Sequence, residues 1–136
     1  MSETYVPIEL RRSVIECANR RCEYCLLPAS VSFLLPHEVD HVIAEKHDGA
    51  TEANKLAYTC WRCNRLKGTD LGSFDPQTGM FSFLYNPRTQ IWEQHFALED
   101  QRIAGLTSEG RTTVKLLQLN RPDRLAERLR LKRRRT

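Results

Sequence analysis

Residues 37–68 read HEVDHVIAEKHDGATEANKLAYTCWRCNRLKG, and this stretch decides the fold class. Residues 38–43 and 56–59 have the composition of two short extended strands, separated by a polar segment with an Asp-Gly turn. Residues 61–67 favour a short helix, which should end near Gly68 because glycine is preferred just after a helix. The stretch therefore predicts an antiparallel hairpin with a helix packed across it.

Two cysteine pairs frame this stretch. Cys22 and Cys25 precede it, and Cys60 and Cys63 lie within it; two residues separate the members of each pair, as is usual in a tetrahedral zinc site. In simple zinc ribbons about 15–20 residues separate the pairs, whereas here 34 residues do, so further structure is inserted. Because four thiolates leave no coordination position open, we predict that the zinc is structural. The fifth cysteine, Cys17, falls on the apolar side of a predicted helix, and we expect it in the core.

Four polar residues within this frame indicate phosphodiester hydrolysis. That reaction needs a base to activate water and a divalent cation to stabilise charge on the phosphate. Because neighbouring side chains of a strand point to opposite faces, Asp40 can bind the metal while His41 activates the water. Asn64, on the predicted helix, can offer its amide oxygen to the same ion, and oxygen ligands suit Mg²⁺ or Mn²⁺. Asn54, late in the loop, can brace the backbone at His41.

The same residues resemble the HNH endonuclease family over about a third of the chain. The resemblance is carried by His37-Glu-Val-Asp-His41, Gly49, Asn54-Lys-Leu56, Cys60-x-x-Cys63, Asn64 and Lys67. It implies a ββα-metal fold around one divalent ion, with Asp40 and Asn64 as metal ligands, His41 as general base and Asn54 as the bracing residue. Many members have a histidine at the position of Asn64, so this chain is a histidine–asparagine–asparagine variant. The HNH domain of RNA-guided CRISPR nucleases is similar in this respect, and the change favours magnesium over softer metals.

The remainder of the chain resembles the C-terminal part of a bacterial HNH subgroup, a less specific likeness. It is carried by Asn86-Pro-Arg88, Trp92, His95-Phe96, Gly105-Leu-Thr107 and Gly110-Arg111. This second resemblance implies nothing further about the mechanism.

Positive charge is concentrated at the C-terminal end. Residues 111–136 hold ten Lys or Arg against two acidic residues, a balance of +8, whereas residues 1–110 have a balance of −4. This asymmetry indicates a polyanionic partner; a solvated helix face with a basic tail is the alternative. The family resemblance implies that this partner is DNA. The predicted nucleic-acid contacts are Arg128, Arg130, Lys132, Arg133, Arg134 and Arg135, together with Arg62, Arg65 and Lys67 around the second cysteine pair. His37 is interpreted as an exposed histidine at a strand edge.

The rest of the chain predicts further short elements. They are a helix over 8–19, an extended segment over 31–35, an antiparallel hairpin of 81–85 with 91–98, a third short strand over 102–106, a helix capped by Thr107 or Ser108, and another starting near Pro122. We therefore predict an α+β fold in one HNH nuclease domain over residues 1–136. Its parts are an N-terminal helix (1–21), a zinc-framed ββα-metal core (22–68), a β-hairpin region (69–106) and a basic helical tail (107–136).

Composition narrows the function class. Hydrophobic residues make up 40% of the chain and charged residues 28%, no apolar run of membrane-spanning length occurs, and no signal-peptide pattern begins the chain. We therefore expect no membrane association and a cytoplasmic location, where thiols stay reduced. The main hypothesis is an endonuclease that nicks DNA as a monomer, since one hairpin carries one site. The alternatives are a non-catalytic zinc module that binds nucleic acid, and a nuclease that depends on a partner protein or a second copy.

Overall fold

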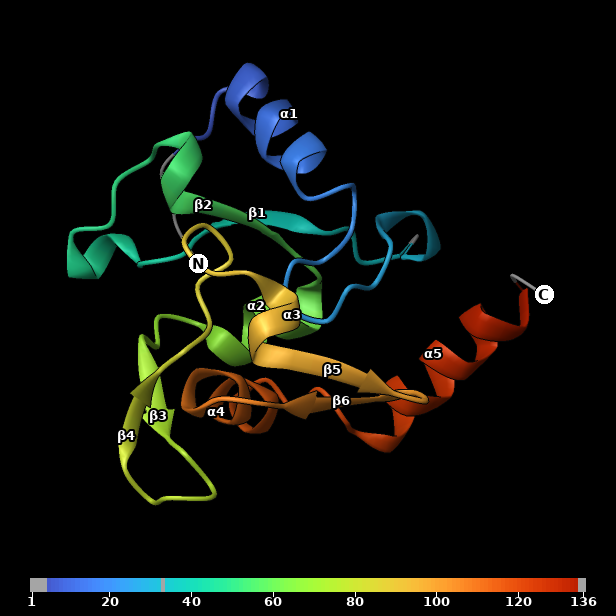
Figure 1. The fold of residues 1–136 in the computed structure, drawn as a ribbon. Helices are drawn as coiled ribbons and strands as arrows, with labels where there is room; N and C mark the ends of the chain where they lie inside the picture. Colours follow the sequence, from blue (N-terminus) through green and yellow to red (C-terminus); the bar gives the residue numbers. More distant parts are fainter. Residues whose placement is uncertain (1–4, 33, 135–136) are drawn as a thin grey trace. The chain divides into compact units, whose positions relative to one another are not determined.

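The computed structural model describes residues 5–32 and 34–134, which form two compact units (Figure 1). The first unit comprises the chain up to Leu71 together with Asn86–Gln90, and the second comprises Gly72–Tyr85 with the chain from Ile91 onward. The mixture of helices and short antiparallel hairpins confirms the predicted α+β class. None of the helices in the described ranges is long and apolar enough to cross a bilayer.

The first unit contains the predicted hairpin and helix. Its elements are α1 (Ile8–Cys17), η1 (Ala29–Val31), β1 (Glu38–His41), η2 (Glu45–His47), η3 (Ala53–Lys55), β2 (Leu56–Thr59) and α2 (Trp61–Lys67). Strands β1 and β2 are antiparallel, with Glu38 opposite Thr59 and His41 opposite Leu56. Helix α2 ends at Lys67 because Gly68 takes a positive φ of 52°, as the sequence predicted.

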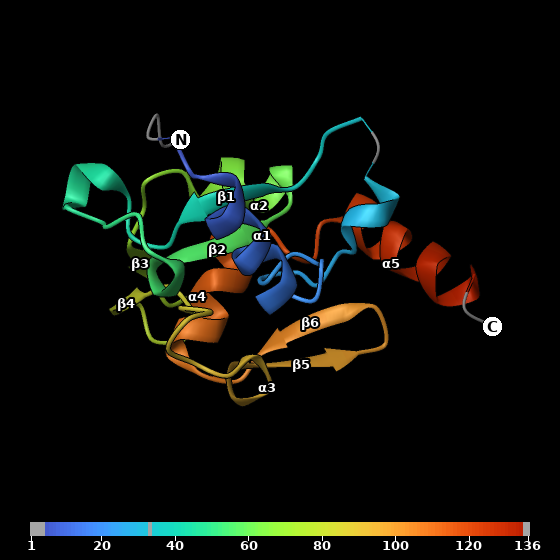
Figure 2. The same ribbon diagram turned by 90° about the horizontal axis from the view of Figure 1, so that it is seen from above.

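Helix α1 and helix α2 contact the hairpin (Figures 1 and 2). The α1 side holds a small core of Val14, Ala18, Leu56 and Tyr58, against which Val39 of β1 packs. Since side chains alternate along β1, Glu38 and Asp40 point away from Val39. The packing of Val39 toward α1 thus leaves the acidic residues of β1 on the opposite face of the strand.

The second unit consists of two hairpins and three helices. They are β3 (Gly72–Phe74), β4 (Phe81–Phe83), α3 (Trp92–His95), β5 (Phe96–Glu99), β6 (Arg102–Gly105), α4 (Ser108–Leu116) and α5 (Pro122–Arg134). The predicted cap of α4 is confirmed, since the Thr107 hydroxyl accepts a hydrogen bond from the Gly110 N–H at 3.1 Å. Gly110 is required for close packing, because a Cβ there would lie 2.1 Å from the His95 carbonyl oxygen.

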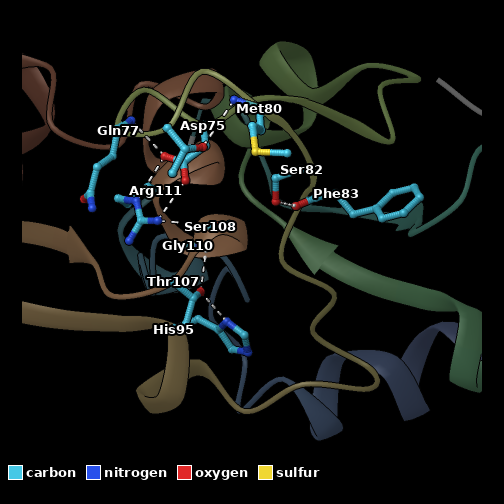
Figure 3. A network of polar contacts seen from close by, with 11 residues as sticks. Asp75, Gln77, Met80, Ser82, Phe83, His95, Thr107, Ser108, Gly110 and Arg111 are labelled. Carbon is cyan, nitrogen blue, oxygen red and sulfur yellow. Dashed lines mark hydrogen bonds and ion pairs between the residues drawn. The ribbon is translucent and has the colours of Figure 1, made fainter.

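A buried ion pair ties the β3–β4 turn to α4 (Figure 3). The Asp75 carboxylate accepts hydrogen bonds from Arg111 Nε at 3.0 Å and Nη2 at 2.8 Å. Asp75 is almost fully buried, and the Arg111 side chain is about one-fifth exposed. These hydrogen bonds hold the pKa of Asp75 well below its usual range, although burial opposes the shift.

The structure corrects three predicted elements. The strand at Phe81–Phe83 pairs with Gly72–Phe74 through the turn at Asp75, and the strand at Phe96–Glu99 pairs with Arg102–Gly105, so the predicted pairing of 81–85 with 91–98 is wrong. Alternating apolar residues predict a strand but do not identify the strand with which it pairs. Turn residues occur both before and after residues 81–85, so pairing with either neighbouring segment was compatible with the sequence. Residues 92–95 form a helical turn, although 91–98 was predicted to be extended.

The other two corrections lie in the first unit. Helix α1 ends at Cys17 and does not reach residue 19, because Asn19 and Arg20 both take positive φ values. In place of an extended segment over 31–35, a 3-10 turn covers Ala29–Val31 and the Ser32 hydroxyl donates to the Leu35 carbonyl at 2.6 Å.

Candidate active site

The four paired cysteines come together in one buried cluster. Sγ atoms of Cys22, Cys25, Cys60 and Cys63 all lie within 4.8 Å of one another, and those of Cys25 and Cys60 are 3.7 Å apart. A zinc–sulfur bond of about 2.3 Å implies sulfurs about 3.8 Å apart in a tetrahedron. The first sulfur of each pair accepts from the backbone N–H of the second member, at 3.5 Å in one knuckle and 3.4 Å in the other. The cluster therefore fits a zinc ion.

The electrostatics of the cluster also favour a cation. Burial raises the pKa of the Cys22 and Cys63 thiols, whereas hydrogen bonds from the other three thiols lower the pKa of Cys60. Several buried thiolates in one place need a compensating positive charge, and zinc supplies it. Since all four ligand positions are protein sulfurs, this ion would serve the fold and not the reaction.

Cys17 lies outside this cluster, and the prediction that it belongs to the core is wrong. It is exposed and occupies the last position of α1. Arg88 Nη1 lies 3.2 Å from its sulfur, and Arg88 also forms an ion pair with Glu23 in the first cysteine knuckle. Glu23 Oε2 in turn accepts from the Tyr58 backbone N–H at 2.8 Å. Residues 86–90 are thereby joined to the zinc frame, a contact that the sequence did not indicate.

Asp40 faces α2, where the structure brings it near Lys67. The Lys67 ammonium is 3.9 Å from Asp40 Oδ2 and donates to the His41 carbonyl at 3.3 Å. Burial raises the pKa of Asp40 and lowers the pKa of Lys67, while their mutual attraction opposes both shifts. The attraction between Asp40 and Lys67 at this distance therefore does not offset the free-energy cost of burying the Asp40 carboxylate. A divalent cation would stabilise the charged carboxylate further.

Asn64 projects from α2 toward the same face of β1. Its amide nitrogen donates to Glu38 Oε2 at 2.7 Å, which fixes which end of the amide is the nitrogen. Sequence reasoning did not single out Glu38. The available signal was its position two residues before Asp40, which places both carboxylates on one face of a strand.

His41 is held by the loop that follows it. Its Nε2 lies 2.8 Å from the hydroxyl of Thr51, and the ring is only 2% exposed. The other ring nitrogen, Nδ1, is buried and has no hydrogen-bond partner within the described ranges. An imidazole whose Nε2–H donates to a hydroxyl keeps a lone pair on Nδ1, so this nitrogen can accept a proton.

Asn54 lies in η3, alongside the end of β1. The backbone at this point is braced by the Val42 N–H, which donates to the Lys55 carbonyl at 3.0 Å. The Asn54 side chain itself is exposed, and the described structure shows no hydrogen bond from it. This backbone hydrogen bond is made by the neighbouring residue, and bracing of His41 by the Asn54 amide stays a prediction.

The predicted nucleic-acid contacts fall into two groups. Arg65 in α2 and Arg130, Lys132, Arg133 and Arg134 in α5 are exposed. Lys67 is 2% exposed and directed at β1, Arg62 lies over the Trp61 ring, and Arg128 donates to the Gln101 and Leu119 carbonyls. Arg135 lies outside the described residues. The second group has contacts within the fold, and phosphate binding by its members stays a prediction.

The interpretation of His37 as an exposed histidine is wrong. It is 4% exposed, its Nε2 donates to the Leu27 carbonyl at 2.8 Å, and its ring packs on Tyr58 with centroids 5.3 Å apart. His37 therefore joins β1 to the loop that follows the first cysteine knuckle.

Comparison with known proteins agrees with this geometry. Residues 22–70 match the model of the HNH endonuclease family, which confirms the resemblance over that stretch. The chain is similar to the Septu protein PtuB of Bacillus thuringiensis, with 28% identity over 120 residues that cover 85% of this chain and 43% of the relative. The chain thus spans less than half the length of that relative. No solved structure matches the chain.

Proposed function

We propose that residues 22–70 form the catalytic core of a metal-dependent endonuclease that hydrolyses phosphodiester bonds of DNA. The single observation that carries the proposal is the arrangement at the end of β1. Asp40 and Asn64 border one face, and the adjacent His41 has a buried ring nitrogen, Nδ1, with no hydrogen-bond partner among the described residues. The match of residues 22–70 to the HNH family supports a nuclease in general. A module that only binds nucleic acid has no need of this arrangement.

In this proposal His41 is the general base. Thr51 Oγ1 lies 2.8 Å from Nε2 and orients the ring; in the tautomer with its proton on Nε2 the hydroxyl accepts, and Nδ1 takes a proton from the attacking water. Thr51 is a positioning residue, since it acts through the imidazole. Lys67 fixes the same strand end by donating to the His41 carbonyl.

Asp40 and the amide oxygen of Asn64 would hold a divalent ion, Mg²⁺ or Mn²⁺, and the buried oxygen donors fit such an ion. When bound, the ion supplies Lewis-acid stabilisation of charge on the phosphate and on the leaving oxygen. Glu38 orients Asn64 by accepting from its amide nitrogen, which leaves the amide oxygen available as a ligand. Asn54 would brace the end of β1 from the adjacent η3 turn, a role for which the described residues show no side-chain hydrogen bond.

The exposed basic residues of α5 would bind the DNA backbone. Arg130, Lys132 and Arg134 are exposed along the last turns of this helix, and such contacts depend on phosphate charge and not on base sequence. One chain offers one catalytic arrangement, so a monomer would nick one strand.

The experiment is incubation of the purified chain with supercoiled plasmid and Mg²⁺, Mn²⁺ or chelator. We expect nicked circles to form only with a divalent ion and to precede linear molecules. Salt-sensitive binding of plasmid with no cleavage under any condition would contradict the proposal and favour a binding module. Cleavage restored by added partner protein would favour the partner-dependent subunit.

A further inference from the structure

A cleft of about 530 Å³ borders the candidate site in the first unit. Asp40 and Asn64 are among the residues that line it. It runs beside β1, which among the described strands pairs with β2 alone. A volume of this size falls in the range of small-ligand pockets, about 300–1,000 Å³.

Other residues of the lining have a different chemistry. An apolar wall is formed by Val6, Ile8 and Pro36, with the ring of Tyr5 beside them. Tyr5 is 79% exposed and Ile8 is 51% exposed, so both present apolar surface to a ligand. Arg11 of α1 contributes a cation to the same lining and is itself exposed.

These features suit one kind of ligand. A nucleotide has an apolar base face that packs on aromatic and aliphatic side chains, and phosphates that attract arginine. We propose that the cleft holds one unstacked nucleotide adjacent to the scissile phosphate. Its base lies against Ile8, Pro36 and Tyr5, and its distal phosphate contacts Arg11.

This inference rests on the proposed function and adds a substrate class to it. A paired base is stacked within the duplex and must be unstacked before it can meet the apolar wall, which costs free energy. An unpaired nucleotide avoids most of that cost. Substrates with an unpaired nucleotide at the cleavage point, in a single strand or a bulge, are therefore preferred over fully paired duplexes.

Binding is tested first, without divalent ion, so that catalysis plays no part. The probe is a short single-stranded DNA with 2-aminopurine at its centre, whose fluorescence changes when the base leaves its neighbours and enters the cleft. The variants are Arg11→Ala, which removes the cation, and Ile8→Trp, which fills the space beside the apolar wall. Arg12→Ala is the matched control, because Arg12 is also exposed on α1 and does not line the cleft. Bound zinc is measured in every variant as a check on folding.

We expect the wild-type chain and Arg12→Ala to change the fluorescence equally. Arg11→Ala should weaken binding and lower the slope of log affinity against log salt by about 0.7, for the one phosphate contact that it removes, and Ile8→Trp should abolish the fluorescence change. Equal behaviour of Arg11→Ala, Ile8→Trp and Arg12→Ala at full zinc content would overturn the inference.

Cleavage gives the second test. A duplex with one bulged nucleotide is compared with the fully paired duplex of the same sequence, in the presence of Mg²⁺. We expect the wild-type chain and Arg12→Ala to cut the bulged duplex at least tenfold faster, and Arg11→Ala to lose most of this preference. Equal rates on both duplexes would overturn the inference even if the nuclease is active. If no substrate is cut, the proposed function fails, and the fluorescence experiment still decides whether the cleft binds a nucleotide.

Discussion

The amide nitrogen of Asn64 donates a hydrogen bond to Glu38 Oε2 at 2.7 Å, across the contact between α2 and β1. A carboxylate can only accept, so this bond determines the orientation of the amide and leaves its oxygen for a cation. Removing a group that orients a metal ligand typically lowers metal affinity about 10–100-fold. We predict a decrease of that size for Mn²⁺ in Glu38→Ala, measured by calorimetric titration.

Glu38→Gln is the matched control for this prediction. Its carbonyl oxygen can still accept from Asn64, so most of the affinity should remain. Wild-type affinity in Glu38→Ala would contradict the positioning role. Equally poor binding by both variants would mean that the Glu38 carboxylate itself ligates the ion.

The cysteine cluster should bind one zinc ion on which the first unit depends for its fold. Structural zinc contributes on the order of 10 kcal/mol in small domains, comparable with the whole stability of such a domain. We predict that Cys60→Ser lacks stoichiometric zinc by elemental analysis and loses the native fluorescence of Trp61. The control is Cys17→Ser, because Cys17 is exposed and outside the cluster. Absence of zinc from that variant would refute the assignment of the four ligands.

The Asp75–Arg111 pair should make the second unit sensitive to acid. Hydrogen bonds from Arg111 hold the pKa of Asp75 below its usual value of about 3.9. A lowered folded-state pKa stabilises the fold above the unfolded-state pKa, and the stabilisation is lost as the pH falls through the folded-state pKa. The ion pair therefore contributes its full stabilisation to the folded state above about pH 4, and this stabilisation decreases below that pH.

We predict that Asp75→Asn lowers the melting temperature of the second unit at pH 6, and that the difference from the parent chain narrows below pH 4. Trp92 reports on this unit when Trp61, the other tryptophan, is replaced by Phe in both chains. A difference that stays constant from pH 6 to pH 2.5 would disprove the linkage.

The basic residues of α5 should divide between DNA binding and folding. Replacing Arg130 and Lys132 with Ala should weaken duplex binding and reduce the slope of log affinity against log salt by about 0.9 for each phosphate that the variant no longer binds. Arg128→Ala should instead lower thermal stability, since its guanidinium donates to the Gln101 and Leu119 carbonyls at 2.9 and 2.6 Å. Binding is measured by fluorescence anisotropy over a salt series. An unchanged salt slope in the double variant would contradict the proposed contact surface.

The hairpin and helix of the zinc frame were predictable because their signals are local. The signals are the alternating residues of 38–41, the Asp-Gly turn and Gly68, and each depends only on residues close by in the sequence. The spacing of the two cysteine pairs predicts that they bind one metal ion together. The partner of the Phe81–Phe83 strand was not predictable, since alternation is equally compatible with a strand on either side.

The roles of single side chains were harder to predict. Cys17 was assigned to the core on helical periodicity, but it is exposed at the last position of α1. His37 was assigned to the surface, whereas a distant carbonyl at Leu27 accepts from it inside the fold. Glu38 and Thr51 support Asn64 and His41 through contacts that depend on how β1, α2 and the loop pack. Such contacts cannot be predicted from the spacing of residues in the sequence.

The most direct test of the account is the cleavage rate of His41→Ala under single-turnover conditions with Mg²⁺. Removal of a general base typically lowers the rate about 10²–10⁴-fold, and we predict a decrease in that range with bound zinc and melting temperature unchanged. Arg65→Ala, on the exposed side of α2, should retain at least a tenth of the wild-type rate. A rate for His41→Ala equal to that of the wild-type chain would contradict the assignment of His41 as the base and attribute the cleavage to another source.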